Sequence, residues 1–295
     1  MLNLAFYKGK DLYSDGDIEN EILHIVDENI SFEKIIAKDN RWPILYHLDK
    51  DRRNILEWYP FKSKGSLLEI GAGCGAITGL FCEKLNKVVV VELSKRRANI
   101  IDKRYKFCKN LDIIVGNIGD INLDLKFDYI TLIGVLEYTK SFFNGEDPYG
   151  EFLRKIKKFL KKDGKLIIAI ENKFGLKYWA GSKEDHSGMY FDSIYGYIQN
   201  SEFETFSKQE LTNIISSNGF IVEKFYYPYP DYKFPQEIFS DDYLPDINHS
   251  LANAPNYDLD RLQLFNEKKA YYNINRNKSF DFFSNSFLLF AGLGE

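Results

Sequence analysis

The sequence predicts an α/β protein whose core is a doubly wound, mostly parallel sheet. Between residues 66 and 170, short runs of Val, Ile and Leu alternate with helical stretches. Strands that are apolar along their whole length are buried on both faces, and strands that alternate with helices form parallel βαβ units. A glycine-rich turn directly follows the first strand, at the sheet edge where such folds bind their ligands. Together these three observations indicate the fold class.

The elements follow in order along the chain. The expected strands are SLLEI (66–70), KVVVVEL (87–93), LDIIVG (111–116), FDYITLIGV (127–135), KLIIAIEN (165–172), IVEKFYYPYP (221–230) and SNSFLLFAGLG (284–294). The expected helices between them cover 76–85, 94–108, about 150–162 and 205–220. The last of these helices opens with a capping pattern and ends in Asn-Gly, which is typical of a helix C-terminus.

Other segments lie outside this alternation. Residues 18–60 have a helical pattern that Pro60 ends, so we expect residues 1–60 to form an N-terminal helical cap. Residues 61–295 would form the main domain. Within it, residues 173–205 and 231–283 are too long for simple connections. The strands before them lead to the carboxyl edge of the sheet or beside it, so both insertions are expected to fold over the active site.

Composition argues against several classes of protein. The chain has 295 residues, 44% of them hydrophobic, so a sizeable core can form. The formal net charge is −4, and the basic run KIKKFLKK (155–162) is expected to be the solvated face of an amphipathic helix. A nucleic-acid partner is therefore not expected. No apolar stretch approaches the roughly 18 residues of a membrane span, and the N-terminus lacks the apolar region of a signal peptide.

The cysteines and histidines predict no metal site. Cys74, Cys82 and Cys108 are an odd number without metal-ligand spacing, and the four histidines are scattered. This pattern fits a reduced cytoplasmic protein with free thiols.

The glycine-rich turn points to a bound cofactor. Gly71, Gly73 and Gly75 occupy alternate positions after the first strand, where the backbone can approach a ligand that side chains would obstruct. Gly71-x-Gly73-x-x-Ala76 also satisfies the dinucleotide fingerprint. The turn therefore suits either a nicotinamide dinucleotide or a different nucleoside cofactor.

Two carboxylates bear on this choice. Glu69, at the end of the strand, would repel a pyrophosphate but attract the ammonium and sulfonium charges of S-adenosylmethionine. Glu92, at the end of the second strand, can accept hydrogen bonds from both ribose hydroxyls, which either cofactor offers. Glu69 thus favours S-adenosylmethionine.

Five motifs resemble those of class I S-adenosylmethionine-dependent methyltransferases. EIGAGCGAIT (69–78) resembles the first motif of that superfamily, and VVVVELS (88–94) resembles its ribose-binding strand end. VGNIGDI (115–121), FDYITLIGVLEY (127–138) and GKLIIAIEN (164–172) resemble the third, fourth and fifth strands. The resemblance implies a Rossmann-like fold with a seven-stranded, mostly parallel sheet and an antiparallel last strand, an ending that nicotinamide-binding folds lack.

A narrower resemblance concerns methyltransferases encoded in bacterial capsule and surface-polysaccharide gene clusters. Residues 42–61, 171–188 and 226–245 carry it. It implies O-methylation of a small polar sugar or phosphorus-linked precursor. Two alternatives stay open: a nicotinamide-dependent oxidoreductase, and a non-catalytic cofactor-binding subunit of a glycan-assembly complex. The expected partner is a small-molecule acceptor.

The superfamily resemblance assigns cofactor contacts residue by residue. Asn117 stands where many of these enzymes have an Asp that contacts the adenine amino group, and Asp120 is the competing assignment. Tyr46 and Arg53 are placed near the methionine end, with local packing as the alternative. The residues expected to line the cofactor are Tyr46, Arg53, Glu69, Gly71, Gly73, Gly75, Glu92, Asn117, Ile118 and Gly134.

The acceptor side is predicted from polar and aromatic residues after the fifth strand. His186 and Glu171 are the candidate general bases, because a hydroxyl acceptor benefits from one and the usual pKa of histidine is near neutrality. His186 as a surface-loop residue and Glu171 as a loop brace are the alternatives. Tyrosine rings suit sugars and nucleobases. The expected substrate-binding residues are Asn172, Tyr178, Tyr190, Tyr229 and Tyr232.

Overall fold

The computed structural model describes residues 2–11, 13–198, 202–255 and 260–294. Within these ranges nine strands follow the order β1-β4-β3-β2-β5-β6-β9-β7-β8, so the expectation of seven was wrong. The additional strands are β1 (Leu2–Asn3) and β8 (Glu237–Ser240). Each is only two to four residues long, too short for the alternation of apolar and polar residues to reveal it.

The chain divides into two compact units, and each is described by itself. The first unit contains residues 1–133 and 155–166, and the second contains 134–154 and 167–295. The helix α8 (Pro148–Lys157) and the strand β6 (Leu160–Glu171) contribute residues to both. The boundary between the units therefore differs from the boundary predicted at residue 60.

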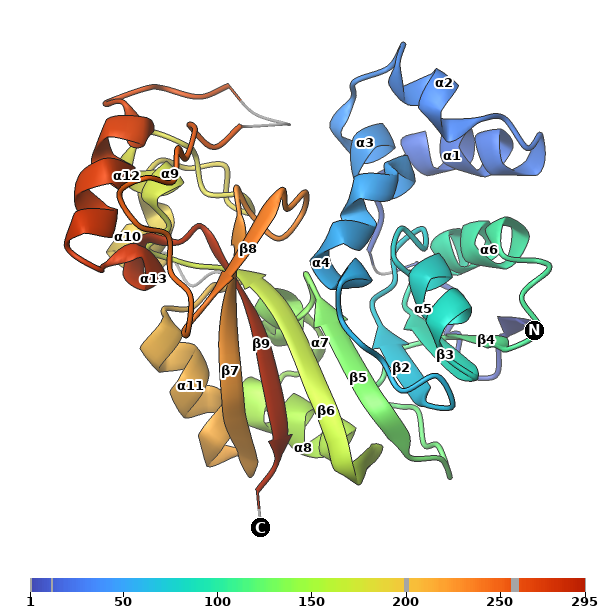
Figure 1. The fold of residues 1–295 in the computed structure, drawn as a ribbon. Helices are drawn as coiled ribbons and strands as arrows, with labels where there is room; N and C mark the ends of the chain where they lie inside the picture. Colours follow the sequence, from blue (N-terminus) through green and yellow to red (C-terminus); the bar gives the residue numbers. More distant parts are fainter. Residues whose placement is uncertain (1, 12, 199–201, 256–259, 295) are drawn as a thin grey trace. The chain divides into compact units, whose positions relative to one another are not determined.

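The first unit is built on parallel strands (Figure 1). These are β2 (Ser66–Ile70), β3 (Lys87–Glu92), β4 (Leu111–Val115) and β5 (Phe127–Ile133), with β1 beside β4. Leu68 in β2 lies between Val89 and Ile130 of the neighbouring strands, and all three are buried. This is the two-sided burial that the continuous apolar runs predicted.

Helices of the first unit pack beside this sheet and on each other. The helices α5 (Thr78–Lys84) and α6 (Lys95–Arg104) follow β2 and β3. The expected N-terminal helical region consists of α1 (Ile18–Asp27), α2 (Phe32–Ile36), α3 (Trp42–Leu48), a 3-10 turn (Lys50–Arg53) and α4 (Asn54–Glu57). Ile22, Ile44 and Leu48 from these helices share one core cluster with Ile100 of α6 and Cys74 of the glycine turn. The N-terminal helices are therefore part of the core that supports the turn.

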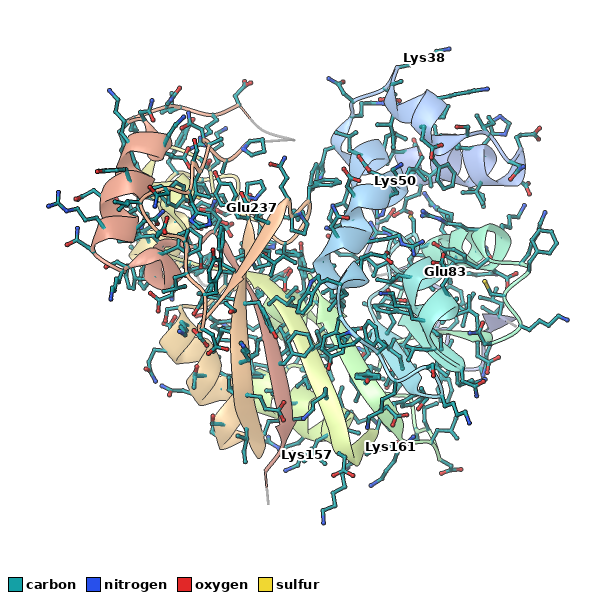
Figure 2. All side chains as sticks on the ribbon, viewed as in Figure 1. Lys38, Lys50, Glu83, Lys157, Lys161 and Glu237 are labelled. Atoms are coloured by element: carbon teal, nitrogen blue, oxygen red, sulfur yellow. The ribbon has the colours of Figure 1, made fainter. Side chains whose placement is uncertain are left out.

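The helix expected over about 150–162 is shorter than predicted. It ends at Lys157, and β6 begins at Leu160 rather than at 165. The physical reason is that the backbone is already paired at this point: Phe127 N donates to Phe159 O at 2.7 Å. Only residues 155–157 of the basic run therefore lie in a helix, so the expected amphipathic helix face is correct only in part. Figure 2 shows Lys157 and Lys161 projecting from the ribbon, while Phe159 and Leu160 are buried.

The second unit contains antiparallel strands. The strand β7 (Phe220–Tyr229) pairs with both β8 and the C-terminal β9 (Ser286–Leu293) in antiparallel fashion. The helix α11 (Lys208–Ser217) packs beside β7. It begins with a complete capping box, in which Ser207 and Glu210 bond each other's backbone N–H groups. The sequence pattern at 205–220 is thus confirmed.

The two insertions have secondary structure of their own. Residues 173–205 contain α9 (Leu176–Trp179) and α10 (Asp192–Tyr195), and residues 231–283 contain β8, α12 (Glu267–Arg276) and α13 (Phe280–Phe283). A 3-10 turn (Leu136–Tyr138) and α7 (Thr139–Phe142) complete the unit. Across the ranges that the structure describes, no helix combines the length and the apolar character needed to cross a membrane.

Candidate functional site

The glycine turn has the backbone conformation that only glycine adopts readily. Gly71, Gly73 and Gly75 have φ of 72°, 56° and 79°. An L-residue in this left-handed region costs roughly 1–2 kcal/mol. Gly71 N donates to Val91 O at 2.9 Å, which ties the start of the turn to β3. The three alternate glycines therefore serve a real conformational need.

Glu92 is held against this turn. Gly73 N donates to Glu92 Oε2 at 2.8 Å, and Ser94 N donates to Glu92 Oε1 at 3.0 Å. Burial raises the pKa of Glu92, although Arg97 and the backbone donors oppose the shift. A carboxylate has about four acceptor positions, so Glu92 retains acceptors for ribose hydroxyls while it organises the turn.

Glu69 is buried beside the same turn and has a neutral partner. Thr78 Oγ1 donates to Glu69 Oε2 at 2.7 Å. Burial raises the pKa of Glu69 to about 8, and the negative charge of Glu92 adds to the shift. The turn therefore carries two buried acidic groups whose ionised forms a cationic cofactor would stabilise and a pyrophosphate would not.

An N-terminal histidine, His47, approaches the turn. His47 is buried, and a Cβ added at Gly73 would come within 3.4 Å of His47 Cε1. His47 Nε2 lies 2.8 Å from Asp15 Oδ2, which also forms an ion pair with Arg97 at 2.7 Å. No spacing rule links positions 15, 47 and 97, so this cluster could be found only from the fold.

Two predicted cofactor residues have other contacts. Arg53 lies 3.0 Å from Glu57 and 2.5 Å from Glu83, so both ends of its guanidinium are occupied by carboxylates. The Tyr46 ring lies under the Arg52 guanidinium, 4.1 Å from ring centroid to Cζ. These contacts agree with the alternative interpretation, in which Tyr46 and Arg53 take part in local packing.

The remaining cofactor residues stand at strand ends as expected. Asn117 and Ile118 follow β4 closely; Ile118 is buried, and Asn117 Oδ1 accepts from Gly119 N at 2.9 Å. The competing residue, Asp120, forms an ion pair with Lys8 at 2.7 Å. Gly134 follows β5 with φ of 69°, and its N–H donates to Ala169 O at 3.0 Å.

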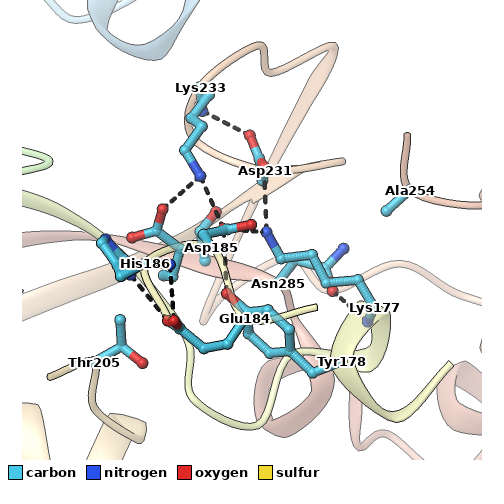
Figure 3. A network of polar contacts seen from close by, with 12 residues as sticks. Lys177, Tyr178, Glu184, Asp185, His186, Thr205, Asp231, Lys233, Ala254 and Asn285 are labelled. Atoms are coloured by element: carbon cyan, nitrogen blue, oxygen red, sulfur yellow. Dashed lines mark hydrogen bonds and ion pairs between the residues drawn. The ribbon is translucent and has the colours of Figure 1, made fainter. Parts of the chain in front are cut away.

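The second unit contains a buried cluster of charged groups, shown in part in Figure 3. We call it the carboxylate–histidine cluster. Its members come from the 3-10 turn after β5, the end of β6, and the two insertions. They are Glu137, Glu171, Lys177, Glu184, Asp185, His186, Asp231 and Lys233.

His186 lies inside this cluster, so its interpretation as a surface-loop residue was wrong. Its side chain is 5% exposed, its Nδ1 lies 2.9 Å from Glu184 Oε1, and its Nε2 lies 3.8 Å from Glu137 Oε1. Burial alone would lower the pKa of His186, but Glu137, Glu184 and Glu171 outweigh burial and raise it. The two predicted base candidates, His186 and Glu171, are thus brought together by the fold.

Asp185, although adjacent to His186 in the sequence, pairs with two lysines instead. Asp185 Oδ2 lies 2.6 Å from Lys177 Nζ and 2.9 Å from Lys233 Nζ. Lys233 Nζ also lies 2.5 Å from Glu171 Oε1. Figure 3 shows Lys177, Asp185 and Lys233 converging from separate segments. The orienting residue is Glu184 instead, two positions before His186.

The predicted substrate-binding residues divide into two groups. Tyr178 and Tyr232 contact the cluster: Tyr178 OH donates to Asp185 at 3.2 Å, and Lys233 Nζ lies 5.3 Å from the Tyr232 ring centroid. Tyr229 instead donates to Ala252 O, and Tyr190 pairs through its backbone with Lys183.

The side chain of Asn172 forms hydrogen bonds with backbone groups. Its Nδ2 donates to Phe282 O at 2.8 Å and to Ser284 O at 2.7 Å, and its Oδ1 accepts from Phe174 N at 3.0 Å. These contacts hold the end of β6 against the segment before β9.

Comparison with known proteins identifies the class of the central region. Residues 68–166 match a family model described as a methyltransferase domain. This range contains the glycine turn and the strand ends up to Gly134. The match confirms the predicted cofactor, S-adenosyl-L-methionine, whose demethylated product is S-adenosyl-L-homocysteine, and it counts against the nicotinamide alternative.

Parts of this chain are similar in sequence to methyltransferases from other organisms. The ribosomal RNA small subunit methyltransferase A of Syntrophus aciditrophicus (strain SB) is 30% identical over 97 residues, which cover 33% of this chain and 32% of that protein. An uncharacterized methyltransferase of Staphylococcus carnosus (strain TM300) is 30% identical over 106 residues, covering 36% of this chain and 47% of that protein. The chain thus spans less than half the length of these relatives.

One solved structure is similar over most of the fold. The CcbJ methyltransferase from Streptomyces caelestis superposes with a TM-score of 0.52 at 13% identity, covering 83% of this chain and 90% of that chain. This likeness confirms the Rossmann-like methyltransferase fold. The segments 42–61, 171–188 and 226–245, which carry the resemblance to capsule-cluster enzymes, lie outside the matched range 68–166.

Proposed function

We propose that the chain is an S-adenosylmethionine-dependent methyltransferase that methylates an oxygen of a small polar acceptor, a sugar or phosphorus-linked precursor of a surface polysaccharide. The observation that carries this proposal is the buried carboxylate–histidine cluster. Buried charges are expensive unless they are paired or used. A polar acceptor with several hydroxyl groups can hydrogen-bond to such a cluster, whereas an apolar acceptor cannot.

The reaction is an in-line displacement at the methyl carbon. The acceptor oxygen forms a bond to this carbon while the carbon–sulfur bond breaks, and the sulfur leaves with the electron pair as neutral S-adenosylhomocysteine. The hydroxyl proton must pass to an acceptor in the site. His186 and Glu171 are the proposed acceptors of that proton. His186 can take it only while its imidazole is neutral, a form that its raised pKa disfavours, and Glu184 holds the imidazole through Nδ1. Positioning of the two reactants supplies most of the remaining rate enhancement.

A small acceptor is favoured over RNA, although one relative carries ribosomal RNA in its name. RNA binding depends on Lys and Arg that neutralise phosphates. The formal net charge of this chain is −4. The acceptor-side candidates His186 and Glu171 are also buried, whereas an RNA chain needs an open, positively charged surface.

A methyl-transfer screen tests the proposal. The full chain is incubated with isotopically labelled S-adenosylmethionine and with nucleotide-activated sugars, capsule intermediates or a small-subunit ribosomal RNA transcript, and products are read by mass spectrometry. Label on an oxygen of a small acceptor is expected. Label on the transcript, or on nitrogen or carbon, would contradict the proposal. Binding of S-adenosylhomocysteine without transfer to any acceptor would favour the non-catalytic alternative.

A further inference from the structure

Three groups of the carboxylate–histidine cluster have the spacing of metal ligands. One carboxylate oxygen each from Glu137 and Glu171 and one ring nitrogen of His186 all lie within 4.8 Å of one another. The separation of 3.8 Å between His186 Nε2 and Glu137 Oε1 is too long for a hydrogen bond. Ligand atoms that share one ion stand about 3–4 Å apart when each is about 2.0–2.2 Å from it.

The imidazole is held as metal-binding histidines are held. Its Nδ1 lies 2.9 Å from Glu184 Oε1 (Figure 3). Its other ring nitrogen, Nε2, lies 3.8 Å from Glu137 Oε1. Glu184 is itself fixed, because its Oε2 accepts from the backbone N–H groups of His186 and Ser187 at 2.7 and 2.6 Å. A carboxylate that bonds the far nitrogen of a ligating histidine fixes its tautomer and orientation.

Unpartnered oxygen atoms provide a second, independent observation. Glu137 is 1% exposed, and its Oε2 has no hydrogen-bond partner among the residues that the structure describes. The same holds for Oε2 of Glu171, which is fully buried. Lys233 pairs with the other oxygen of Glu171, Oε1, so it leaves Oε2 open. Burying an oxygen without a hydrogen-bond partner costs free energy, and a bound cation would offset that cost.

The charge of the cluster has the sign that a cation would balance. Its members include five carboxylates, from Glu137, Glu171, Glu184, Asp185 and Asp231, and two ammonium groups, from Lys177 and Lys233. Without an ion, a protonated imidazole would leave two negative charges in this buried region. A metal-binding imidazole is neutral, so a bound ion would face three negative charges. A divalent cation would neutralise two of them.

We propose that Glu137, Glu171 and His186 bind a divalent transition-metal ion. One imidazole nitrogen with two carboxylate oxygens suits Zn²⁺ or Mn²⁺ better than Mg²⁺ or Ca²⁺, which prefer oxygen ligands alone. Three protein ligands leave positions for water or an acceptor oxygen. With the ion bound, His186 and Glu171 would act as its ligands rather than as proton acceptors, and an acceptor hydroxyl on the ion would lose its proton to water more readily. The site goes beyond the proposed function, because metal binding does not require that the chain transfer a methyl group.

Calorimetry on the full chain tests the site. The protein is stripped with a chelator and titrated with ZnCl2 and, separately, with MnCl2. One equivalent of at least one ion is expected to bind. Glu137→Gln and His186→Ala should each weaken binding more than a hundredfold, and the positioning variant Glu184→Gln should weaken it about 10–100-fold. Glu202→Gln changes an exposed carboxylate of the same unit and serves as the matched control.

A spectroscopic measurement on the wild-type chain covers the case in which a variant does not fold. X-ray absorption of the Zn²⁺ complex should show nitrogen and oxygen ligands at about 2.0–2.2 Å, the outer-shell scattering of one imidazole ring, and no sulfur ligand. Failure of both ions to bind one equivalent would overturn the proposal, as would unchanged affinity in folded Glu137→Gln and His186→Ala. Sulfur ligands in the spectrum would also overturn it. Calorimetry with S-adenosylhomocysteine on the stripped protein reports separately on the cofactor site, so failure of one proposal leaves the other testable.

Discussion

The glycine turn of the first unit and the carboxylate–histidine cluster of the second are assembled in different ways. The turn and its partner come from one short stretch, residues 69–75, and from Glu92 at the end of the adjacent strand. The cluster draws on four separate stretches, at 137, 171, 177–186 and 231–233. Local backbone conformation creates the first site, whereas packing of distant segments creates the second.

The two regions also stabilise their buried carboxylates differently. Glu69 has a hydroxyl partner, Thr78, and its pKa is raised to about 8 by burial. Asp185 is also buried enough that desolvation alone would raise its pKa, but Lys177 and Lys233 lower it overall. Glu69 in the turn is paired with a neutral hydroxyl, so a cationic ligand can still stabilise its ionised form. In the cluster, the ammonium groups of Lys177 and Lys233 already balance part of the negative charge.

The largest expected effect is on stability, from removing a cation of the cluster. Lys233→Met deletes the ammonium that lies 2.5 Å from Glu171 and 2.9 Å from Asp185. Leaving buried charges uncompensated should lower the free energy of unfolding by about 3–5 kcal/mol. Lys161→Met is the control, because its pair with Asp128 at 2.7 Å involves a lysine side chain that is 46% exposed. That change should cost about 0–1 kcal/mol. Urea unfolding in chelator measures both, and equal losses would contradict the contrast.

The next-largest expected effect is on cofactor affinity, and it distinguishes the cofactor site from the carboxylate–histidine cluster. Glu92→Ala should weaken S-adenosylhomocysteine binding roughly ten- to a hundredfold, because charge-assisted hydrogen bonds to the ribose are worth about 1.5–3 kcal/mol. His186→Ala should leave this affinity unchanged, and Glu33→Ala, at an exposed helix start, is a further control. Calorimetry measures all three. Unchanged affinity in Glu92→Ala, or binding of NADH by the wild-type chain, would refute the assignment.

Sequence patterns predict the glycine turn better than they predict the carboxylate–histidine cluster. β2 was predicted residue by residue, because apolar runs and glycine positions report on the local chain. The approach of His47 to Gly73 and the pairing of Lys233 with Glu171 were not predicted, since each joins residues more than 25 positions apart. Glu184 was missed although Glu-x-His is visible in the sequence, because two residues of spacing does not show which neighbour an imidazole will bond.

A matched pair of glycines gives a smaller effect. Gly73 and Gly188 have similar φ of 56° and 66°, so alanine at either position should cost about 1–2 kcal/mol of stability. Only the Cβ of Gly73→Ala would meet a neighbour, His47 Cε1 at 3.4 Å; nothing lies within 4 Å at Gly188. Gly73→Ala should therefore also weaken S-adenosylhomocysteine binding, while Gly188→Ala should not. Thermal unfolding and calorimetry read the two consequences separately, and equal cofactor affinities in the two variants would argue against a close approach of the ligand at Gly73.

The last expected effect, which is spread over three pH units, is a pH dependence that belongs to the turn. The pKa of Glu69 is raised to about 8 in the folded chain, against about 4.3 for an unperturbed glutamate. Between these values the folded state binds the proton and the unfolded state does not, so the contribution of Glu69 to stability is present at low pH and declines as pH rises towards 8. The slope for one proton is at most about 1.4 kcal/mol per pH unit. Glu69→Gln cannot lose this proton, so the stability of the wild type relative to this variant should fall between pH 5 and pH 8, as measured by urea unfolding. Glu33→Gln, an exposed position, should follow the wild type. If the wild type instead gains stability relative to Glu69→Gln over this range, Glu69 is ionised in the folded chain. The chain itself would then supply a cationic partner for Glu69, and the cofactor would not be needed for that role.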